Sequence, residues 1–599
     1  MKKWISIITT CLLLAAVIIV ATGVLNRNAE YTVKSTPAME GTKQLDNIDL
    51  RFYKDSPHVP YYGMKSYLAL LRQEELTVTS EKDGSAIITA PNGATLQIDT
   101  KADTIAATDW ALFQNPLMPY TSLTGVKDTP CQWTYYSDIV FDDAPKTVVF
   151  DFGKYGIRVY ADKDDVYLPI GILSTMFTDI AMNYAFYNGE TFYRSMLDLD
   201  SLGGLPAGYF ESENMRALLS GERKRDEDEI RESYGELCFI IDYFYGFPGR
   251  AAFDENIREK GLDETLKKDH EEIRNALLSD DMRDFYCGLN TLMVEGLKDG
   301  GHTLFSGGYS LTYENSPYPE LRDMLRDTFR TESNLALSMA QSELDVSIIM
   351  ARDKAWGSDT YRECGNTAII TFDDFMPYVD EWEAYYAGSG EIPDDPLGRT
   401  LTGLKKASEN PKITNILFDI TANSGGSNDV LSAILDLTTG DNEFHGTNVL
   451  TGQHQHVVLH TDKNFDGVID DKDDEVKYDF NYAVLTTREA FSCGNLFPFL
   501  MQENGAVLLG EPTGGGSCAV QVAALSNGVT FQMSSHMWAL GNKKGENVEA
   551  GCNTDIPIKR IEPATPSFSD PHYSSGDYTP FFDEVMLDKL INDWFAANE

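Results

Sequence analysis

The sequence predicts an α/β protein, in which a core of mixed sheet and helices follows a helical segment and a β-rich N-terminal part. Two observations predict this class. Towards the end of the chain, strand-like runs such as "NTAIITFDDF" and "ITNILFDI" alternate with helical patterns such as "NDVLSAILDLT", and strands that alternate with helices form sheets covered by those helices. In addition, a chain of 599 residues exceeds the size of one hydrophobic core, which predicts two or three units.

The first predicted element, residues 1–30, is an export segment. Lys2 and Lys3 precede an uncharged run from Trp4 to Leu25, which is long enough to span a hydrocarbon core that needs about 20 apolar residues. The segment is therefore either a cleaved signal peptide or an N-terminal membrane anchor. We expect the rest of the chain to be exported, either extracellular or at the cell surface.

Three units are predicted after the export segment. Residues 31–195 alternate short strand-like runs with turns, including a hairpin signal at Asn92-Gly93, and predict a β-rich accessory domain. Residues 196–335 carry apolar residues at three- and four-residue spacing, which predicts helices ending in a loop that carries a histidine. Residues 336–599 form the predicted α/β core.

The composition excludes one class of partner. The chain has 93 acidic and 49 basic residues, for a net charge of -44, and such an acidic surface repels nucleic acid. Seven cysteines follow the export segment at wide, irregular spacing. This spacing is not that of a metal-binding comb, and it leaves the disulfide pairing open.

A serine between a strand and a helix is the first candidate for chemistry. In "REAFSCGNLF", Ser492 follows a strand and a short turn, and a helical pattern begins directly after it. Its hydroxyl would lie near exposed N–H groups and the positive end of the helix dipole, where an oxyanion would be stabilised. Two interpretations remain open from this stretch alone: a helix cap or a nucleophile.

Two other segments supply groups that a nucleophilic serine needs. In "FDITANSGGSNDV", a buried strand ends in Asn423, Gly425 and Gly426, and adjacent glycines let backbone N–H groups approach a substrate, although a tight turn explains them equally well. In "LKDGGHTLF", His302 stands on a connection just after a helix. That position suits a general base, and an ordinary loop histidine is the alternative.

Together these segments resemble the C-terminal processing peptidases and their tricorn-core and retinoid-binding-protein relatives. "DGGHT" is similar to the family's Asp-Gly-His-Thr element with one glycine extra, and "DITANSGG" to its Asp-x-Arg-x-Asn-x-Gly-Gly turn, with Thr421 where arginine is usual. "TTREAFSCGN" resembles the nucleophile segment, "GEPTGGGS" the following Gly-Glu-x-Thr turn, and "VEAGCNTDIPI" the closing Glu-x-x-Gly-x-x-Pro-Asp element, shortened and without its proline. The five motifs occur in the family's order.

The resemblance implies a ClpP/crotonase-like peptidase core that cleaves protein or peptide substrates through an acyl-enzyme. The Ser-Lys branch of the family needs a lysine after the Gly-Glu-x-Thr turn, where this chain has three glycines and a serine. The tricorn-like branch instead implies Ser492 as nucleophile, His302 as base and Glu549 as the group that orients the base. Glu546 is the rival orienter and His536 the rival base.

The oxyanion donors implied by the same resemblance are backbone groups. They are the N–H of Cys493 and the N–H of Gly425 or Gly426. Catalysis by this arrangement needs no cofactor. The competing hypothesis is a catalytically inactive, calcium-stabilised surface binding protein with the same fold, as in the retinoid-binding relatives. Hydrolysis of a non-peptide ester by the same residues is a third possibility.

An independent motif predicts a structural calcium site. The run "DKNFDGVIDDKD", residues 462–473, has the spacing of an EF-hand-type loop inserted in the core, with Gly467 at the sharp bend. The predicted ligands are Asp462, Asn464, Asp466, the carbonyl of Val468, Asp470 and Asp473. A solvated acidic turn is the alternative, as is another metal.

Histidines just before this loop raise a further possibility. In "HQHVVLH", His454, His456 and His460 share one face if the run is a strand, because residues two apart point to the same side. The run is then either a transition-metal site or the polar side of an exposed strand.

Overall fold

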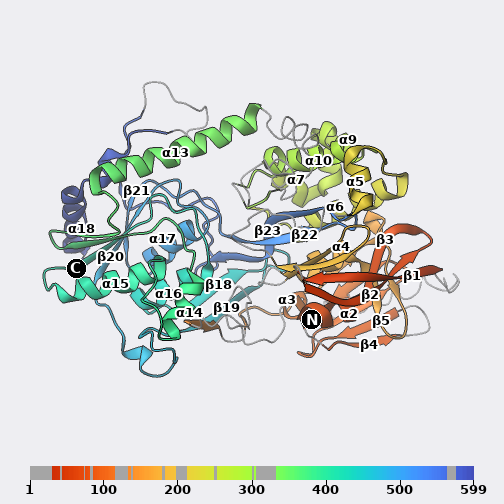
Figure 1. Cartoon of the computed structure of the whole chain (residues 1–599), viewed down its shortest axis with the longest axis horizontal. Helices are drawn as coiled ribbons and strands as arrows, with labels where there is room; N and C mark the ends of the chain where they lie inside the picture. The colour runs from red at the N-terminus through yellow and green to blue at the C-terminus, as the bar shows by residue number, and fades with distance from the viewer. Residues whose placement is uncertain are drawn as a thin grey trace, which may run out of the picture.

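The computed structural model describes most of the chain after the export segment (Figure 1). The described residues are 30–40, 43–72, 75–80, 85–114, 133–136, 139–178, 183–196, 212–248, 252–299, 302–304, 332–562 and 575–598. The predicted export segment lies outside them, and its fate stays a prediction. Among the described residues, we find no helix that combines the length and the apolar character needed to cross a membrane.

The predicted α/β core is confirmed by a six-stranded sheet with the order β15-β16-β17-β20-β21-β24. All neighbours from β16 to β24 are parallel, and β15 is an antiparallel edge strand. The strands are β15 (Tyr361–Cys364), β16 (Thr367–Thr371), β17 (Asn415–Asp419), β20 (Asn481–Thr486), β21 (Val507–Gly510) and β24 (Ile556–Pro557). Parallel strands of this kind are buried on both faces, which explains their nearly continuous apolar runs.

Helices cover both faces of this sheet (Figure 1). On one face, Ile370 and Phe418 pack with apolar residues of α15 (Pro396–Glu409), α16 (Asn428–Thr439) and α17 (Cys493–Glu503). On the other face, Ile369 and Leu417 pack with apolar residues of α13 (Glu332–Trp356), the turn of 3-10 helix η7 (Thr579–Phe582) and α18 (Glu584–Asn598). Consecutive residues of one strand thus pack against helices on opposite faces of the sheet. A further helix, α14 (Val379–Tyr386), lies near the loop of residues 462–473.

A second six-stranded sheet joins the core to the N-terminal half. Its order is β22-β23-β18-β19-β8, and β9 also pairs with β19. The strands are β8 (Thr134–Tyr136), β9 (Val140–Phe141), β18 (Glu443–Thr447), β19 (His454–Thr461), β22 (Cys518–Ala524) and β23 (Thr530–Gly541). Two strands from the N-terminal third of the chain therefore extend a sheet whose other members come from the last third.

The N-terminal part holds two further sheets and is β-rich, as predicted. A seven-stranded sheet has the order β11-β12-β3-β2-β1-β14-β13, and a five-stranded sheet has the order β10-β7-β6-β5-β4. The strands of the first are β1 (Tyr31–Glu40), β2 (Lys43–Tyr53), β3 (Ser56–Gly63), β11 (Tyr160–Ala161), β12 (Val166–Pro169), β13 (Asn183–Tyr187) and β14 (Phe192–Met196). Those of the second are β4 (Thr77–Ser80), β5 (Ser85–Thr89), β6 (Thr95–Asp99), β7 (Thr104–Ala107) and β10 (Val148–Asp151). The predicted hairpin joins β5 to β6 through Gly93, whose φ is 86°.

Helices occupy much of the region predicted to be helical. They are α5 (Glu213–Ser220), α6 (Glu227–Phe244), α7 (Ala252–Lys260), α8 (Leu262–Asp269), α9 (Glu271–Leu277), α10 (Met282–Thr291) and a π-helical turn, Leu292–Leu297. The shorter helices α2 (Met64–Arg72), α3 (Trp110–Gln114) and α4 (Ile170–Phe177) accompany the N-terminal sheets.

One hydrophobic cluster unites these N-terminal layers with the end of the β22–β23 hairpin. Leu173 of α4 and Phe244 of α6 belong to the same buried cluster as Val522 and Phe531. Gly171 of α4 is needed at this contact, because a Cβ there would lie 2.6 Å from the Ala524 carbonyl oxygen. The hairpin thus links the two halves seen in Figure 1. The predicted domain boundaries stay a prediction.

Candidate active site

Ser492 occupies a strained turn between β20 and α17. Its φ of 56° and ψ of -120° are rare for a residue with a side chain, and it stands at the N-cap position of α17 without a capping hydrogen bond from its hydroxyl. Ordinary N-cap residues are extended and bond the helix N–H groups through their side chain. Backbone strain of this kind concentrates at functional sites, so the conformation favours the nucleophile interpretation over the cap.

Main-chain hydrogen bonds hold this turn in place. The Ser492 N–H donates to the Gly515 carbonyl oxygen at 3.0 Å, and the Phe491 N–H donates to the Asn423 carbonyl oxygen at 3.1 Å. The side-chain amide of Asn495, in the first turn of α17, also donates to the Val548 carbonyl oxygen at 3.0 Å and accepts from the Thr513 hydroxyl at 2.6 Å. The nucleophile turn is therefore bonded to the glycine turn before it and to two segments after it.

The glycine turn lies directly beside the Ser492 hydroxyl. A Cβ on Gly425 would lie 2.7 Å from the Ser492 Cβ and 3.2 Å from its Oγ, and the φ of Gly425 is 114°. Only glycine meets both conditions without strain. The Gly425 N–H donates to the Asn423 side chain at 3.0 Å, whereas among the described residues we find no acceptor for the N–H of Gly426 or of Cys493.

Cys493 has the contacts of a buried structural thiol. Its Sγ donates to the Gly426 carbonyl oxygen at 3.1 Å and to the Asn428 side chain at 3.2 Å. Burial raises the pKa of Cys493 to about 12. Since the thiolate is the reactive form of cysteine, this thiol is a poor nucleophile at neutral pH.

The loop with His302 is clamped to β23 and reaches the nucleophile turn. Leu304 and Gln532 exchange main-chain hydrogen bonds at 3.0 Å, and the Gln532 side chain donates to the His302 carbonyl oxygen at 2.9 Å. The His302 ring is buried, and its centroid lies 4.9 Å from that of Phe491, the residue directly before Ser492. The described residues resume at His302 on this loop, so the two glycines of the "DGGHT" motif, residues 300 and 301, lie outside them.

Asp299 connects the same loop to β23 through hydrogen bonds. Its carboxylate accepts from the Thr303 N–H at 2.7 Å, from the Thr303 hydroxyl, and from the Ser534 hydroxyl at 2.8 Å. The Asp-Gly-His-Thr resemblance therefore corresponds to a structural unit in which the aspartate and threonine bracket the histidine.

Glu549 is buried, and hydrogen bonds connect it to the segment that contacts Phe491. Its Oε2 accepts from the Ser517 N–H at 2.6 Å and from the Cys518 N–H at 2.9 Å, and its carbonyl oxygen accepts from the Gly516 N–H at 3.0 Å. Gly516 lies against the Phe491 ring, because a Cβ on it would approach the ring to 2.6 Å. The segments of Ser492, His302 and Glu549 thus meet around one phenylalanine.

The two rival residues have other surroundings. Glu546 is exposed in a turn, where its side chain accepts from Asn542 at 2.8 Å. His536 is fully buried, lies 3.2 Å from the Gln114 side chain and packs on Phe244. Burial lowers the pKa of His536 to about 3, which makes it a weak base.

An arginine that sequence patterns did not identify supports the glycine turn. Arg352 of α13 forms two hydrogen bonds of 2.6 Å with Asp373, and its guanidinium lies 3.5 Å from a carboxylate oxygen of buried Asp419. Asp419 is the first residue of the glycine-turn motif. A guanidinium thus lies beside Asp419, although the motif itself has Thr421 in place of arginine, and it comes from a helix far away in the sequence.

The predicted calcium loop has a compact conformation. Gly467 has a φ of 85°, and its N–H donates to Asp462 at 2.8 Å. Asp473 accepts from the Asn464 N–H at 3.1 Å and from the Asp470 N–H at 2.8 Å. Asp462 and Asp473, at the two ends of the loop, are buried.

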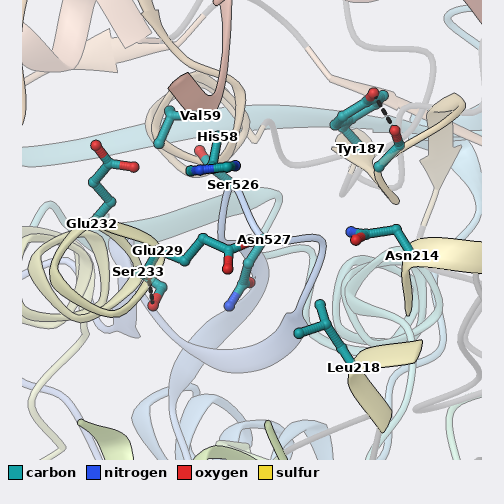
Figure 2. A pocket seen from close by; sticks show the side chains of 11 residues that line it. His58, Val59, Tyr187, Asn214, Leu218, Glu229, Glu232, Ser233, Ser526 and Asn527 are labelled. Carbon is teal, nitrogen blue, oxygen red and sulfur yellow. Dashed lines mark hydrogen bonds between the residues drawn. The ribbon is translucent and has the colours of Figure 1, made fainter. Parts of the chain in front are cut away.

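A separate hollow, away from Ser492, His302 and Glu549, lies in the N-terminal half (Figure 2). His58 of β3, Glu232 of α6 and Asn527 of the β22–β23 turn border it. Burial raises the pKa of Glu232 to about 8 and that of nearby Glu236, which accepts two hydrogen bonds from Ser526, to about 7. These carboxyl groups belong to the junction between α6 and the hairpin, and none of the predicted site residues borders the hollow.

A strained serine between a parallel strand and a helix, with a glycine turn beside its hydroxyl, is the arrangement in which serine hydrolases hold their nucleophile. Residues 391–558 match the model of Peptidase family S41, in agreement with the family resemblance of the motifs in this region. The His-base branch of the family stays a prediction. No curated protein matches the chain in sequence.

Solved structures with similar elements include three that differ widely in length. A lipoprotein from Streptococcus agalactiae is 12% identical, with a TM-score of 0.31 over 55% of this chain and 91% of that one. The tricorn protease is 12% identical, with a TM-score of 0.28 over 91% of this chain and 60% of that one. The photosystem II D1 C-terminal processing protease is 12% identical, with a TM-score of 0.25 over 36% of this chain and 48% of that one. This chain thus spans about half to three fifths of the last two.

Proposed function

We propose that this protein is an exported serine endopeptidase that hydrolyses peptide bonds with Ser492, His302 and Glu549. The observation that supports the proposal best is the meeting of three distant segments at Phe491. The His302 ring packs on Phe491, and the strained Ser492 directly follows it. Gly516, whose N–H donates to the Glu549 carbonyl oxygen, lies against the Phe491 ring. The S41 match supports the peptidase class.

In the proposed reaction, the Ser492 Oγ attacks the substrate carbonyl while the His302 imidazole accepts its proton. A serine hydroxyl is a weak nucleophile at neutral pH, so proton transfer to a neutral imidazole during the attack lowers the barrier. The Glu549 carboxylate, fixed by two backbone N–H groups, favours the useful tautomer and stabilises the imidazolium. His302 then returns the proton to the leaving amine, and water hydrolyses the acyl-enzyme.

The negative charge that develops on the carbonyl oxygen needs hydrogen-bond donors in place before the reaction. We assign this role to the N–H groups of Cys493 and Gly426, which have no acceptor among the described residues. Gly425 serves differently, since its N–H already donates to Asn423. Its role is to keep the space beside the Ser492 hydroxyl open. Preorganised donors of this kind each contribute about 3–4 kcal/mol to transition-state stabilisation.

A serine-directed fluorophosphonate tests this proposal. The full chain is expected to bind one equivalent covalently, and peptide mapping should place the label on Ser492. Ser492→Ala should remove the label. Ser424→Ala, which changes an exposed serine of the neighbouring glycine turn, should retain it. Two negative results together would reject the peptidase and favour a binding protein. They are no labelling of the folded wild-type protein and no cleavage of an unfolded protein substrate by it.

We also propose that the loop of residues 462–473 binds a structural Ca²⁺ ion. Its support is the burial of two loop-end carboxylates, Asp462 and Asp473, together with the glycine bend at the sixth position. Burying carboxylates without a nearby cation is costly, and oxygen ligands at this spacing suit calcium. The Tyr386 hydroxyl donates to Asp462 at 3.1 Å, so the loop is tied to α14.

Removal of calcium is expected to lower the melting temperature of the protein. At a calcium concentration about 100 times the Kd, binding contributes about 2.7 kcal/mol, which corresponds to a shift of a few degrees in a chain of this size. The measurement compares melting curves in chelator, in excess Ca²⁺ and after Ca²⁺ is restored. Asp466→Asn should weaken the calcium effect, and Asp471→Asn, a loop acid outside the ligand spacing, should not. A melting temperature that is the same in chelator and in excess Ca²⁺ would exclude the site.

A further inference from the structure

Two histidines face each other across the β18–β19 pair. His445 and His456 are directly opposite residues of the antiparallel register, and their ring centroids lie 5.1 Å apart. Side chains of opposite residues in such a pair project from the same face of the sheet. The histidine side chains are 11% and 17% exposed, so the pair is sheltered but open to an ion from solvent.

A carboxylate from the N-terminal third of the chain completes this group. β9 pairs with β19 through Val140 opposite His456, and Asp142 follows β9. The Asp142 carboxylate lies 3.0 Å from the Nδ1 of His456, and the Asp142 N–H donates to the His454 carbonyl oxygen at 2.9 Å. The backbone thus holds Asp142 beside the histidine pair independently of its side chain.

The spacing of these three side chains suits a small transition-metal ion. One ligand atom from each of Asp142, His445 and His456 lies within 4.8 Å of the other two. Ligand atoms around a tetrahedral zinc lie about 3.3 Å apart, because each is about 2.0 Å from the metal. Small side-chain rotations therefore bring the three into coordination range, and imidazole with carboxylate is a common zinc ligand set.

We propose that Asp142, His445 and His456 bind a structural Zn²⁺ ion that fastens the residue 139–143 segment to the β18–β19 pair. Glu443 offers a fourth ligand, since its carboxylate lies 3.1 Å from the Nε2 of His445. It also forms an ion pair of 3.0 Å with Lys543. A water molecule completes the tetrahedron when Glu443 stays with that lysine.

The other two histidines of the "HQHVVLH" run do not belong to this site. The Nδ1 of His454 lies 3.2 Å from the Thr447 hydroxyl, and its Nε2 lies against Gly545, where a Cβ would approach it to 1.7 Å. His460, four residues after His456 on β19, is paired with Tyr135 of β8. The sequence places three histidines on one face, and the fold selects only His456 and adds a partner from another strand.

Zinc titration of the full chain, prepared without a histidine tag and with Ca²⁺ in excess, tests the proposal. One Zn²⁺ per chain is expected, with competition against a chromophoric chelator reporting the affinity. His445→Gln and His456→Gln should each weaken binding at least about 100-fold, because even groups that only orient metal ligands change affinity by 10–100-fold. His454→Gln, on the same face, should bind zinc within about twofold of wild type. Asp466→Asn in the calcium loop should leave zinc binding unchanged.

X-ray absorption at the zinc edge provides a readout that does not depend on variants. Two imidazoles in the first coordination shell of the wild-type protein are expected. The proposal is overturned if wild-type protein binds no stoichiometric zinc, if the absorption shows no imidazole pair, or if folded His445→Gln and His456→Gln proteins retain full affinity.

Discussion

Ser492→Ala is expected to reduce the kcat for peptide hydrolysis by about 10⁴–10⁶-fold while leaving the fold intact. The hydroxyl is the only group that forms the proposed acyl-enzyme, so its loss leaves substrate binding and the N–H donors but no nucleophile. Removing one oxygen atom from a half-exposed side chain that makes no capping bond should hardly change stability. Steady-state cleavage of a fluorogenic peptide, with melting curves for both proteins, measures the two effects separately.

The dependence of Ser492 on His302 is visible in a double variant. His302→Ala alone should cost a similar factor, and Ser492→Ala/His302→Ala should be no slower than either single variant, because residues that act as one unit are not additive. His536→Gln is the matched control, since that histidine is buried against Phe244. If the reduction in kcat of the double variant equals the product of the two single reductions, or if His302→Ala cleaves at the normal rate, His302 is not the base.

Arg352→Met is expected to lower the free energy of unfolding by about 3–5 kcal/mol, the cost of leaving a buried charge without its partner. Asp419 is fully buried, whereas Asp373, the other partner of Arg352, is 42% exposed and can be hydrated. Activity should fall as well, because Asp419 begins the turn that carries Gly425 and Gly426. Chemical denaturation and peptide cleavage are the two measurements.

The pH dependence of this loss identifies its cause. Burial raises the pKa of Asp419, and Arg352 opposes that rise, so the variant has a still higher pKa in the folded state. A carboxyl group with a raised pKa destabilises the fold when ionised, and this penalty disappears as the pH falls to the unfolded pKa of about 3.9. The deficit of Arg352→Met should therefore be largest at neutral pH and shrink towards pH 4.

A second variant separates the charge from lost packing. Arg352→Met/Asp419→Asn removes the buried charge together with its partner and should recover much of the stability lost in Arg352→Met. If the double variant is as unstable as the single one and the deficit does not change with pH, the guanidinium acts through packing rather than through Asp419.

Local patterns in the sequence were sufficient to predict the main elements of the core. The run "ITNILFDI" became β17 and "NDVLSAILDLT" became α16, because an apolar strand between two helical layers and an amphipathic helix each show their own periodicity. The Asn92-Gly93 turn could also be predicted, because the tight turn itself requires a residue with positive φ at the position of Gly93. Motif order also pointed to Ser492, His302 and Glu549.

Contacts between distant segments were beyond such patterns. Nothing near Asp419 in the sequence indicates that Arg352 of α13 provides its guanidinium. In the same way, the face shared by His454, His456 and His460 is a property of one strand, but the pairing of His456 with His445 and Asp142 depends on which strands lie next to β19. Strand order and register depend on the packing of the whole chain.

The sequence by itself determined which segments form most strands and helices of the core, because periodicity acts over a few residues. Its motifs also carry the family resemblance that implies Ser492, His302 and Glu549 as candidates for chemistry. Only the tertiary structure decided the strained conformation of Ser492, the burial of Glu549 and exposure of Glu546, and the partners of Asp419 and His456. These features arise where segments separated by tens to hundreds of residues pack together, and the free energy of that packing belongs to the assembled layers rather than to any one stretch of chain.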